Sequence, residues 1–121
     1  MSHRRIYGDY LKDMLDSAEK AISFVGEFDF DQFESDEKTN FAVLRALEIV
    51  GEAAKKVPAE FRASHTEIPW REIAGTRDKL THEYFGVNLP VVWKTVKEDL
   101  PGLIVHLRNI LADIDQVDEN G

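Results

Sequence analysis

The stretch "KTNFAVLRALEIVGEAAKKV", residues 38–57, decides the fold. Its apolar residues recur at steps of three and four positions, which is the spacing of one face of an α-helix. They are Phe41, Val43, Leu44, Leu47, Val50, Ala54 and Val57. Ser35 or Asp36 can cap the start of this helix, and Pro58 ends it because proline disfavours helical geometry in the residue before it. The sequence therefore predicts a helix over residues 36–57 that buries one face.

Small residues on this helix predict a close neighbour. Gly51 costs about 1 kcal/mol relative to alanine within a helix, and Ala53 and Ala54 follow it closely. Side chains this small leave room for the backbone of another segment. We therefore expect another helix to approach here.

The rest of the chain continues the helical pattern. Further helices are expected over residues 5–25, over 69 to about 86, and from 88 to about 114, with one helical turn near 59–62. Pro101 and Gly102 should kink or break the last helix. The acidic connector at residues 27–37 carries three phenylalanines, which we expect to dock onto the core.

No strand pattern, internal repeat or linker is visible in the sequence. We therefore predict an all-α fold, an up-and-down bundle of four to five helices that forms one domain over residues 1–121. The last helix looks more apolar than one neighbour could cover. A helical dimer interface is therefore expected as well.

Composition limits the function. The 121 residues have a formal net charge of −8 and include no cysteine, which excludes disulfides and thiolate chemistry. No apolar run approaches the roughly 20 residues of a membrane span, and no signal core follows the N-terminus, so we expect a soluble, cytoplasmic protein without membrane contact. The acidity argues against non-specific nucleic-acid binding, which depends on lysine and arginine. A local basic site can still act, particularly if two chains pool their positive residues.

The segment "GTRDKLTHEYFGV", residues 75–87, carries the candidate chemistry. On an ideal helix Arg77 and Tyr84 share a face, with Thr81 between them, whereas His82 lies well round the cylinder. Two routes could bring Arg77 and His82 together. The helix can loosen near His82, or a second copy of the segment can face the first across a two-fold axis.

These residue types suit RNA cleavage without a metal. Histidine exchanges protons near neutral pH, as activation of a ribose 2′-hydroxyl requires. The planar fork of arginine matches phosphate oxygens and can stabilise the charge of the transition state. Arg77 and His82 would thus be catalytic. Lys79 could add charge toward the substrate, Asp78 could orient either residue, and Tyr84 could contact a phosphate or stack on a base.

Taken alone, this spacing leaves alternatives open. An arginine five residues before a histidine is common by chance, and a histidine near a helix C-terminus also interacts favourably with the helix dipole. Other features give no competing site. No grouping has metal-ligand spacing and no glycine-rich phosphate loop occurs, so we expect neither a metal nor a cofactor. Glu48 and Glu52 more simply belong to a solvated face or form an ion pair with Arg45 or Lys55.

Three segments resemble the HepT-like toxins of the HEPN superfamily of helical RNases. They are "EIPWREIAGTRDKLTHEYFGV" (residues 67–87), "KTNFAVLRALEIVGEAAKKV" (residues 38–57) and "VWKTVKEDLPGL" (residues 92–103). The resemblance covers nearly the whole chain, and the three segments occur in the family's order. The resemblance implies a HEPN-like fold.

The resemblance also implies a function. It makes Arg77 and His82 the catalytic pair of a metal-independent endoribonuclease toxin, assembled at a homodimer cleft, with an RNA substrate such as a tRNA or an mRNA. Asp78, Lys79 and Thr81 would support the site or bind substrate. A minimal nucleotidyltransferase antitoxin would silence the toxin by transferring AMP to Tyr84. The alternative is a non-catalytic helical module that binds a nucleotidyltransferase.

Overall fold

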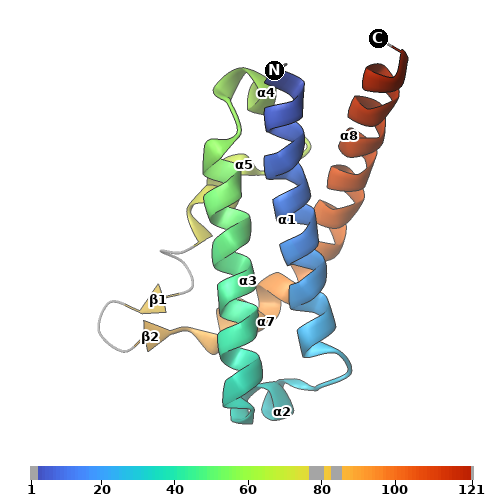
Figure 1. The fold of residues 1–121 in the computed structure, drawn as a ribbon. Coiled ribbons are helices and arrows are strands. Elements are labelled where there is room, and N and C mark those ends of the chain that lie inside the picture. Colours follow the sequence, from blue (N-terminus) through green and yellow to red (C-terminus); the bar gives the residue numbers. More distant parts are fainter. Residues whose placement is uncertain (1–2, 77–80, 83–85, 121) are drawn as a thin grey trace.

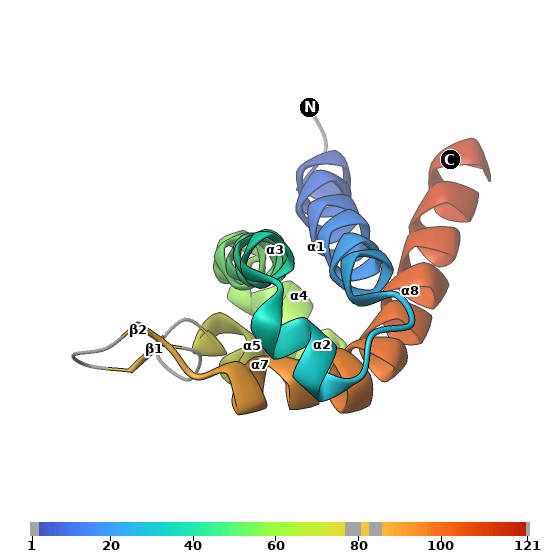
Figure 2. The same ribbon diagram turned by 90° about the horizontal axis from the view of Figure 1, so that it is seen from below.

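The structure is a computed structural model that describes residues 3–76, 81–82 and 86–120. Three long helices dominate it: α1 (His3–Val25), α3 (Glu37–Lys56) and α8 (Leu100–Asn120). Helix α1 packs along both α3 and α8 and runs antiparallel to them (Figures 1 and 2). This arrangement confirms the predicted all-α, up-and-down bundle. None of the helices in the described part of the chain is long and apolar enough to cross a membrane.

Short elements connect the long helices. They are α2 (Phe30–Ser35), α4 (Ala59–Ser64), α5 (Trp70–Ala74), α7 (Leu89–Lys94), the π-helical turn η1 (Thr95–Asp99), and the strands β1 (Thr81–His82) and β2 (Gly86–Val87). Seen from below, α2, α5 and α7 lie together on one side of α1 and α3 (Figure 2). Helices α2, α5 and α7 therefore form a second layer over the long helices.

Helix α2 lies within the predicted acidic connector, where no helix was expected. Asp29 accepts a hydrogen bond from the backbone of Gln32, and the Gln32 side chain accepts one from the backbone of Asp29. This reciprocal pair satisfies two N–H groups that a helix start leaves open. Phe33 is fully buried, and the ring of Phe30 stands edge-on to Trp93 at 5.9 Å. The predicted docking of the phenylalanines is thus confirmed.

Helix α3 carries the central face of the core. Asp36 caps it by accepting a hydrogen bond from Thr39 N at 3.3 Å. The predicted stripe is buried at Val43, Leu47, Val50, Ala54 and Val57. Gly51 lies directly against the backbone of α5, as its size predicted.

The helix predicted over residues 69–86 is not continuous. Helix α5 ends at Ala74, where Gly75 N–H donates back to Arg71 O at 3.0 Å. Strand β1 pairs antiparallel with β2, and His82 stands opposite Gly86. The expectation of a helix without strands is therefore wrong here. β-Branched and aromatic residues around positions 81–87 favour extended backbone, which explains the difference.

The last predicted helix begins where expected and is broken where expected. Asn88 caps α7 by accepting a hydrogen bond from Val91 N at 3.3 Å. Before Pro101 the turn widens, and Leu100 N–H reaches Thr95 O, five residues back. Proline lacks an N–H and its ring crowds the carbonyl four residues earlier, so a wider turn relieves the clash.

The apolar face of α8 is covered within one chain. Leu103, Ile104, Leu107, Ile110 and Leu111 are all buried. Among the described residues of α8, Val105 is the exposed large hydrophobic side chain. The chain itself therefore covers this face over the residues whose side chains are described, and the dimer interface expected from its composition stays a prediction.

Candidate functional site

Strands β1 and β2, which belong to the predicted catalytic segment, lie at the edge of the bundle on the side of α3 (Figure 1). The structure describes the backbone of Thr81 and His82, which form β1. The other predicted site residues, Arg77, Asp78, Lys79 and Tyr84, lie outside the described residues. Because β1 is extended, the helical face predicted for the segment does not apply. The chain does depart from helical geometry at His82, which is one of the two predicted routes.

Helices hold this segment at both of its ends. On the N-terminal side, Thr76 Oγ1 donates a hydrogen bond to Glu72 O at 3.2 Å. On the C-terminal side, β2 leads directly into Asn88, the residue that caps α7. The positions of α5 and α7 therefore determine where the segment starts and ends.

Helix α5 is itself fixed by two backbone contacts. The Trp70 side chain is buried, and its Nε1–H donates a hydrogen bond to His65 O at 2.9 Å. A Cβ atom on Gly51 would lie only 3.1 Å from Ile73 O, so α3 and α5 are in close contact. The position of Thr76 in the bundle thus depends on two features: the burial of Trp70, and the lack of a side chain at Gly51.

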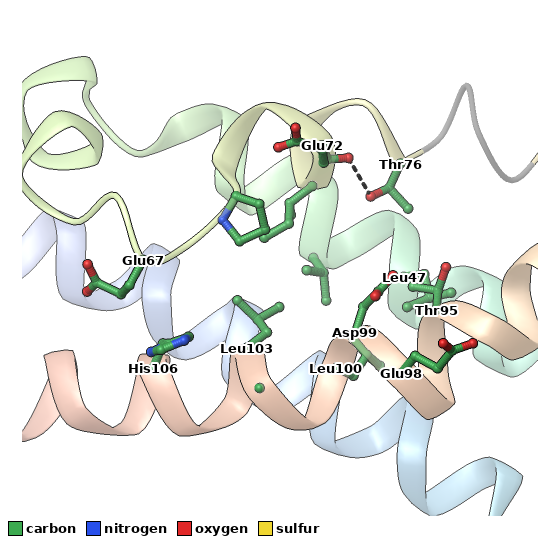
Figure 3. A pocket seen from close by; sticks show the side chains of 14 residues that line it. Leu47, Glu67, Glu72, Thr76, Thr95, Glu98, Asp99, Leu100, Leu103 and His106 are labelled. Atoms are coloured by element: carbon green, nitrogen blue, oxygen red, sulfur yellow. Dashed lines mark hydrogen bonds between the residues drawn. The ribbon is translucent and has the colours of Figure 1, made fainter.

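A groove opens between α5 on one side and η1 with α8 on the other (Figure 3). We call it the acidic groove; its volume is about 280 Å³. Its apolar floor consists of Leu47, Val50, Ile73, Leu100 and Leu103. Its carboxylates are Glu67, Glu72, Glu98 and Asp99. Thr76, the last described residue before Arg77, also lines it, so the groove adjoins the predicted catalytic segment.

One carboxylate of the groove has a shifted titration. The pKa of Glu67 lies below its usual value of 4.5, chiefly because the residue's own backbone N–H donates to the carboxylate. Slight burial opposes this shift, while His65 and then His106 add to it. The Glu67 Oε1 to His65 Nδ1 distance is 3.4 Å, and Glu67 and His106 mark one end of the groove (Figure 3).

Comparison with known proteins identifies the family. Residues 14–111 match the model of the family described as "Ribonuclease HepT-like". The chain belongs to the HepT-like ribonuclease family. A relative from Thermococcus cleftensis, named "Probable ribonuclease HepT", is 54% identical over 100 residues, which is 83% of this chain and 91% of that protein.

Two other relatives have names that begin with "Putative RNase". One, from Methanocaldococcus jannaschii, is 40% identical over 92% of each chain. The other, from Caldanaerobacter subterraneus subsp. tengcongensis, is 45% identical over 84% of this chain and 91% of its own length. No solved structure matches the HepT-like chain at a significant level.

The remaining charged candidates in this HepT-like chain have structural roles. Arg45 Nη1 lies 3.9 Å from Glu48 and 3.7 Å from Glu52, which confirms the predicted ion pairs. The His65 ring stacks on Phe61 at 4.4 Å. In the described part of the chain, no three histidine or acidic residues gather as they would around a metal ion.

Sequence reasoning missed the acidic groove. Glu67 and Glu72 come from the segment around α5, whereas Glu98 and Asp99 come from η1, 26 to 32 positions later. No spacing pattern joins residues from separate elements. The excess of acidic residues was the sole available signal, and it does not say where they gather.

Proposed function

We propose that this HepT-like chain is a metal-independent endoribonuclease in which Arg77 and His82 act on RNA. The observation that carries the proposal is the family match over residues 14–111 in a chain that has both residues at the motif spacing. The departure from helical backbone at β1 supports it as well. Because the backbone at β1 is not helical, His82 can take a position that it would not have on a straight helix.

The proposed reaction is an internal transesterification. His82 takes the proton of a ribose 2′-hydroxyl, and the 2′-oxygen attacks the adjacent phosphorus. The 5′-oxygen of the next nucleotide leaves and takes up a proton. Arg77 donates hydrogen bonds to the phosphate oxygens as negative charge builds on them. The products are a 2′,3′-cyclic phosphate and a 5′-hydroxyl.

The proposed active form is a homodimer with the two motifs facing one cleft. Two copies of Arg77 and Lys79 would gather four positive charges at one cleft, although each chain carries a formal net charge of −8. Asp78 and Thr81 would orient these side chains or bind the RNA. The dimer would thus create a local positive site within an acidic protein.

The proposed control is covalent. A minimal nucleotidyltransferase would transfer AMP from ATP to the hydroxyl of Tyr84, which lies between β1 and β2 in the sequence, and pyrophosphate would leave. The adduct adds bulk and a negative charge two residues from His82, where it would repel an RNA phosphate. The resulting pair would be a toxin and its antitoxin.

Cleavage of RNA by the purified protein in EDTA tests the proposal. We expect products that end in 2′,3′-cyclic phosphate, and a rate lowered about 10²–10⁴-fold by His82→Ala, as for loss of a general acid–base group. His3→Ala, at the first residue of α1, is the matched control. A strict metal requirement, or full activity in folded His82→Ala, would refute the mechanism. Absence of cleavage and of growth arrest would favour the non-catalytic module.

A further inference from the structure

Helix α7 and the turn η1 carry two exposed lysines close to the predicted catalytic segment. Strand β2 leads through Asn88 into α7 (Figure 1). Lys94 and Lys97 are both exposed. At about 1.5 Å of rise per residue, they lie roughly 9 and 13 Å along the helix axis from Asn88. No ion pair among the described residues involves either lysine. Two positive charges are therefore available near the end of β2.

An aromatic cluster holds Lys97 in place. Its Nζ lies 4.9 Å from the centroid of the Trp93 ring, which is within the range of a cation–π interaction. The Trp93 ring packs in turn against Phe33 at 5.5 Å and edge-on against Phe30 at 5.9 Å. These two phenylalanines belong to α2, which lies beside α7 (Figure 2). Packing from two elements thus fixes the ring over which the ammonium group sits.

The charge on η1 differs from one side to the other. Glu98 and Asp99 line the acidic groove, whereas Lys94 and Lys97 do not. Carboxylates repel RNA phosphates, and lysines attract them. Because the groove adjoins the predicted catalytic segment, an RNA strand at that segment is repelled on the groove side. The charges therefore favour a path for the RNA over the lysine-bearing face of α7 and η1.

We propose that Lys94 and Lys97 bind phosphates of the RNA on one side of the cleaved bond, and that Trp93 positions Lys97 for this contact. The inference rests on the proposed function above, and membership of a ribonuclease family makes RNA the ligand that these lysines meet. An ammonium group that is already held in place loses less side-chain entropy when it binds a phosphate. The lysines contact RNA away from the reacting atoms, so they hold the ground state and the transition state alike. They should therefore lower KM without raising kcat.

RNA binding by charge-removed variants tests this contact. Lys94→Met with Lys97→Met removes two charges but keeps two long apolar side chains. Lys12→Met with Lys55→Met makes the same net charge change at exposed positions on α1 and α3. Both pairs are placed in a His82→Ala chain, so that the RNA is bound but not cut. Fluorescence anisotropy with a labelled single-stranded RNA gives each Kd at several salt concentrations, and circular dichroism confirms that each variant is folded.

We expect loss of the two α7 and η1 lysines to weaken Kd at least about tenfold, and the control pair to change it about twofold or less. The slope of log Kd against log salt concentration should fall by about 1.4, because each phosphate contact of a single strand contributes about 0.7. In the chain that retains His82, the same lysine variant should raise KM and leave kcat unchanged. Trp93→Leu should weaken binding when Lys97 is present, and should have little further effect in the Lys97→Met chain.

Three results would contradict the proposal in different ways. Equal Kd values and salt slopes in the lysine and control variants, with RNA still cleaved by the chain that retains His82, would overturn the phosphate contact and leave the proposed function intact. A fall in kcat without a rise in KM would overturn the role in binding. If the chain without substitutions neither binds nor cleaves RNA, the proposed function fails and this inference fails with it.

Discussion

The backbone carbonyl of Ile73 lies against Gly51, where a Cβ atom would come within 3.1 Å of the carbonyl oxygen. Real Cβ contacts are seldom this short, so the neighbouring carbonyl would have to move. The contact sets how closely α5 approaches α3. Through Thr76, it also sets where the predicted catalytic segment begins.

Gly51→Ala should lower the free energy of unfolding by about 1 kcal/mol. The better helix propensity of alanine offers about 1 kcal/mol, but forcing α5 outward costs roughly 1–3 kcal/mol. Gly102→Ala is the matched control, because a Cβ there would meet nothing within 4 Å. It should raise stability by up to about 1 kcal/mol. Urea unfolding measures both, and equal stabilisation by the two variants would show that α5 does not press on Gly51.

Asn88→Ala should affect both stability and RNA cleavage. Loss of its hydrogen bond to Val91 N removes the cap of α7 and costs about 1 kcal/mol. Because β2 ends at the preceding residue, the loosened cap should also lower kcat. Asp29→Ala removes the cap of α2 at a similar cost, away from this segment. Equal activity of the two variants at 25 °C would argue that the cap does not position the site.

Tyr84→Phe should abolish modification while leaving the fold intact. After incubation with the cognate transferase and ATP, the protein without a substitution should gain the mass of one or more AMP units. The variant should gain none, because it lacks the acceptor hydroxyl. Mass spectrometry of the intact proteins measures the difference. An AMP adduct on Tyr84→Phe would mean that another residue is the acceptor. Tyr7→Phe, in α1, serves as the control that retains Tyr84.

Glu67→Gln should reduce stability in a pH-dependent way. The pKa of Glu67 is lowered in the folded state, so its carboxylate stabilises the fold above the unfolded value near 4.5. That contribution is lost as the pH falls below 4.5 through the folded value. The two proteins should therefore differ at pH 6, by less than about 1 kcal/mol because Glu67 is exposed. The difference should shrink as the pH falls below 4.5. Thermal unfolding measures this, with Glu60→Gln as the control for net charge. A constant difference across this range would contradict the cause given.

Local chemistry made much of the fold predictable. The stripe from Val43 to Val57, the cap at Asn88 and the break before Pro101 each depend on near neighbours in the sequence, and all three are present. The small size of Gly51 also correctly predicted the close approach of another helix, which is α5. Periodicity is a reliable guide wherever one face of a long helix is buried.

The region of the candidate site was less predictable. The spacing of apolar residues predicted a helix that continues through Thr81. In the structure Thr81 pairs with Val87 instead, and the backbone there is extended. The acidic groove depends on Glu72 and Asp99, which belong to separate elements and come to one place only in the folded chain. The roles of His82 and Tyr84 remain predictions that the variants above test, and the role of Arg77 remains a prediction.

The π-helical turn at Thr95–Asp99 has a consequence for α8 as a whole. A π turn holds one residue more than an α-helical turn, so the extra residue is taken up within about one turn. Deleting one residue there would restore regular α-helix and leave the later side chains in nearly the same phase, with Leu103 and Leu107 still facing the core. Deleting a residue from the regular helix just after the turn would instead rotate each later side chain by about 100° around the axis. Leu107 would then leave the core, and solvated residues such as Arg108 would turn toward it. The π turn is therefore the place in this helix where the chain can lose a residue and keep the packing of α8.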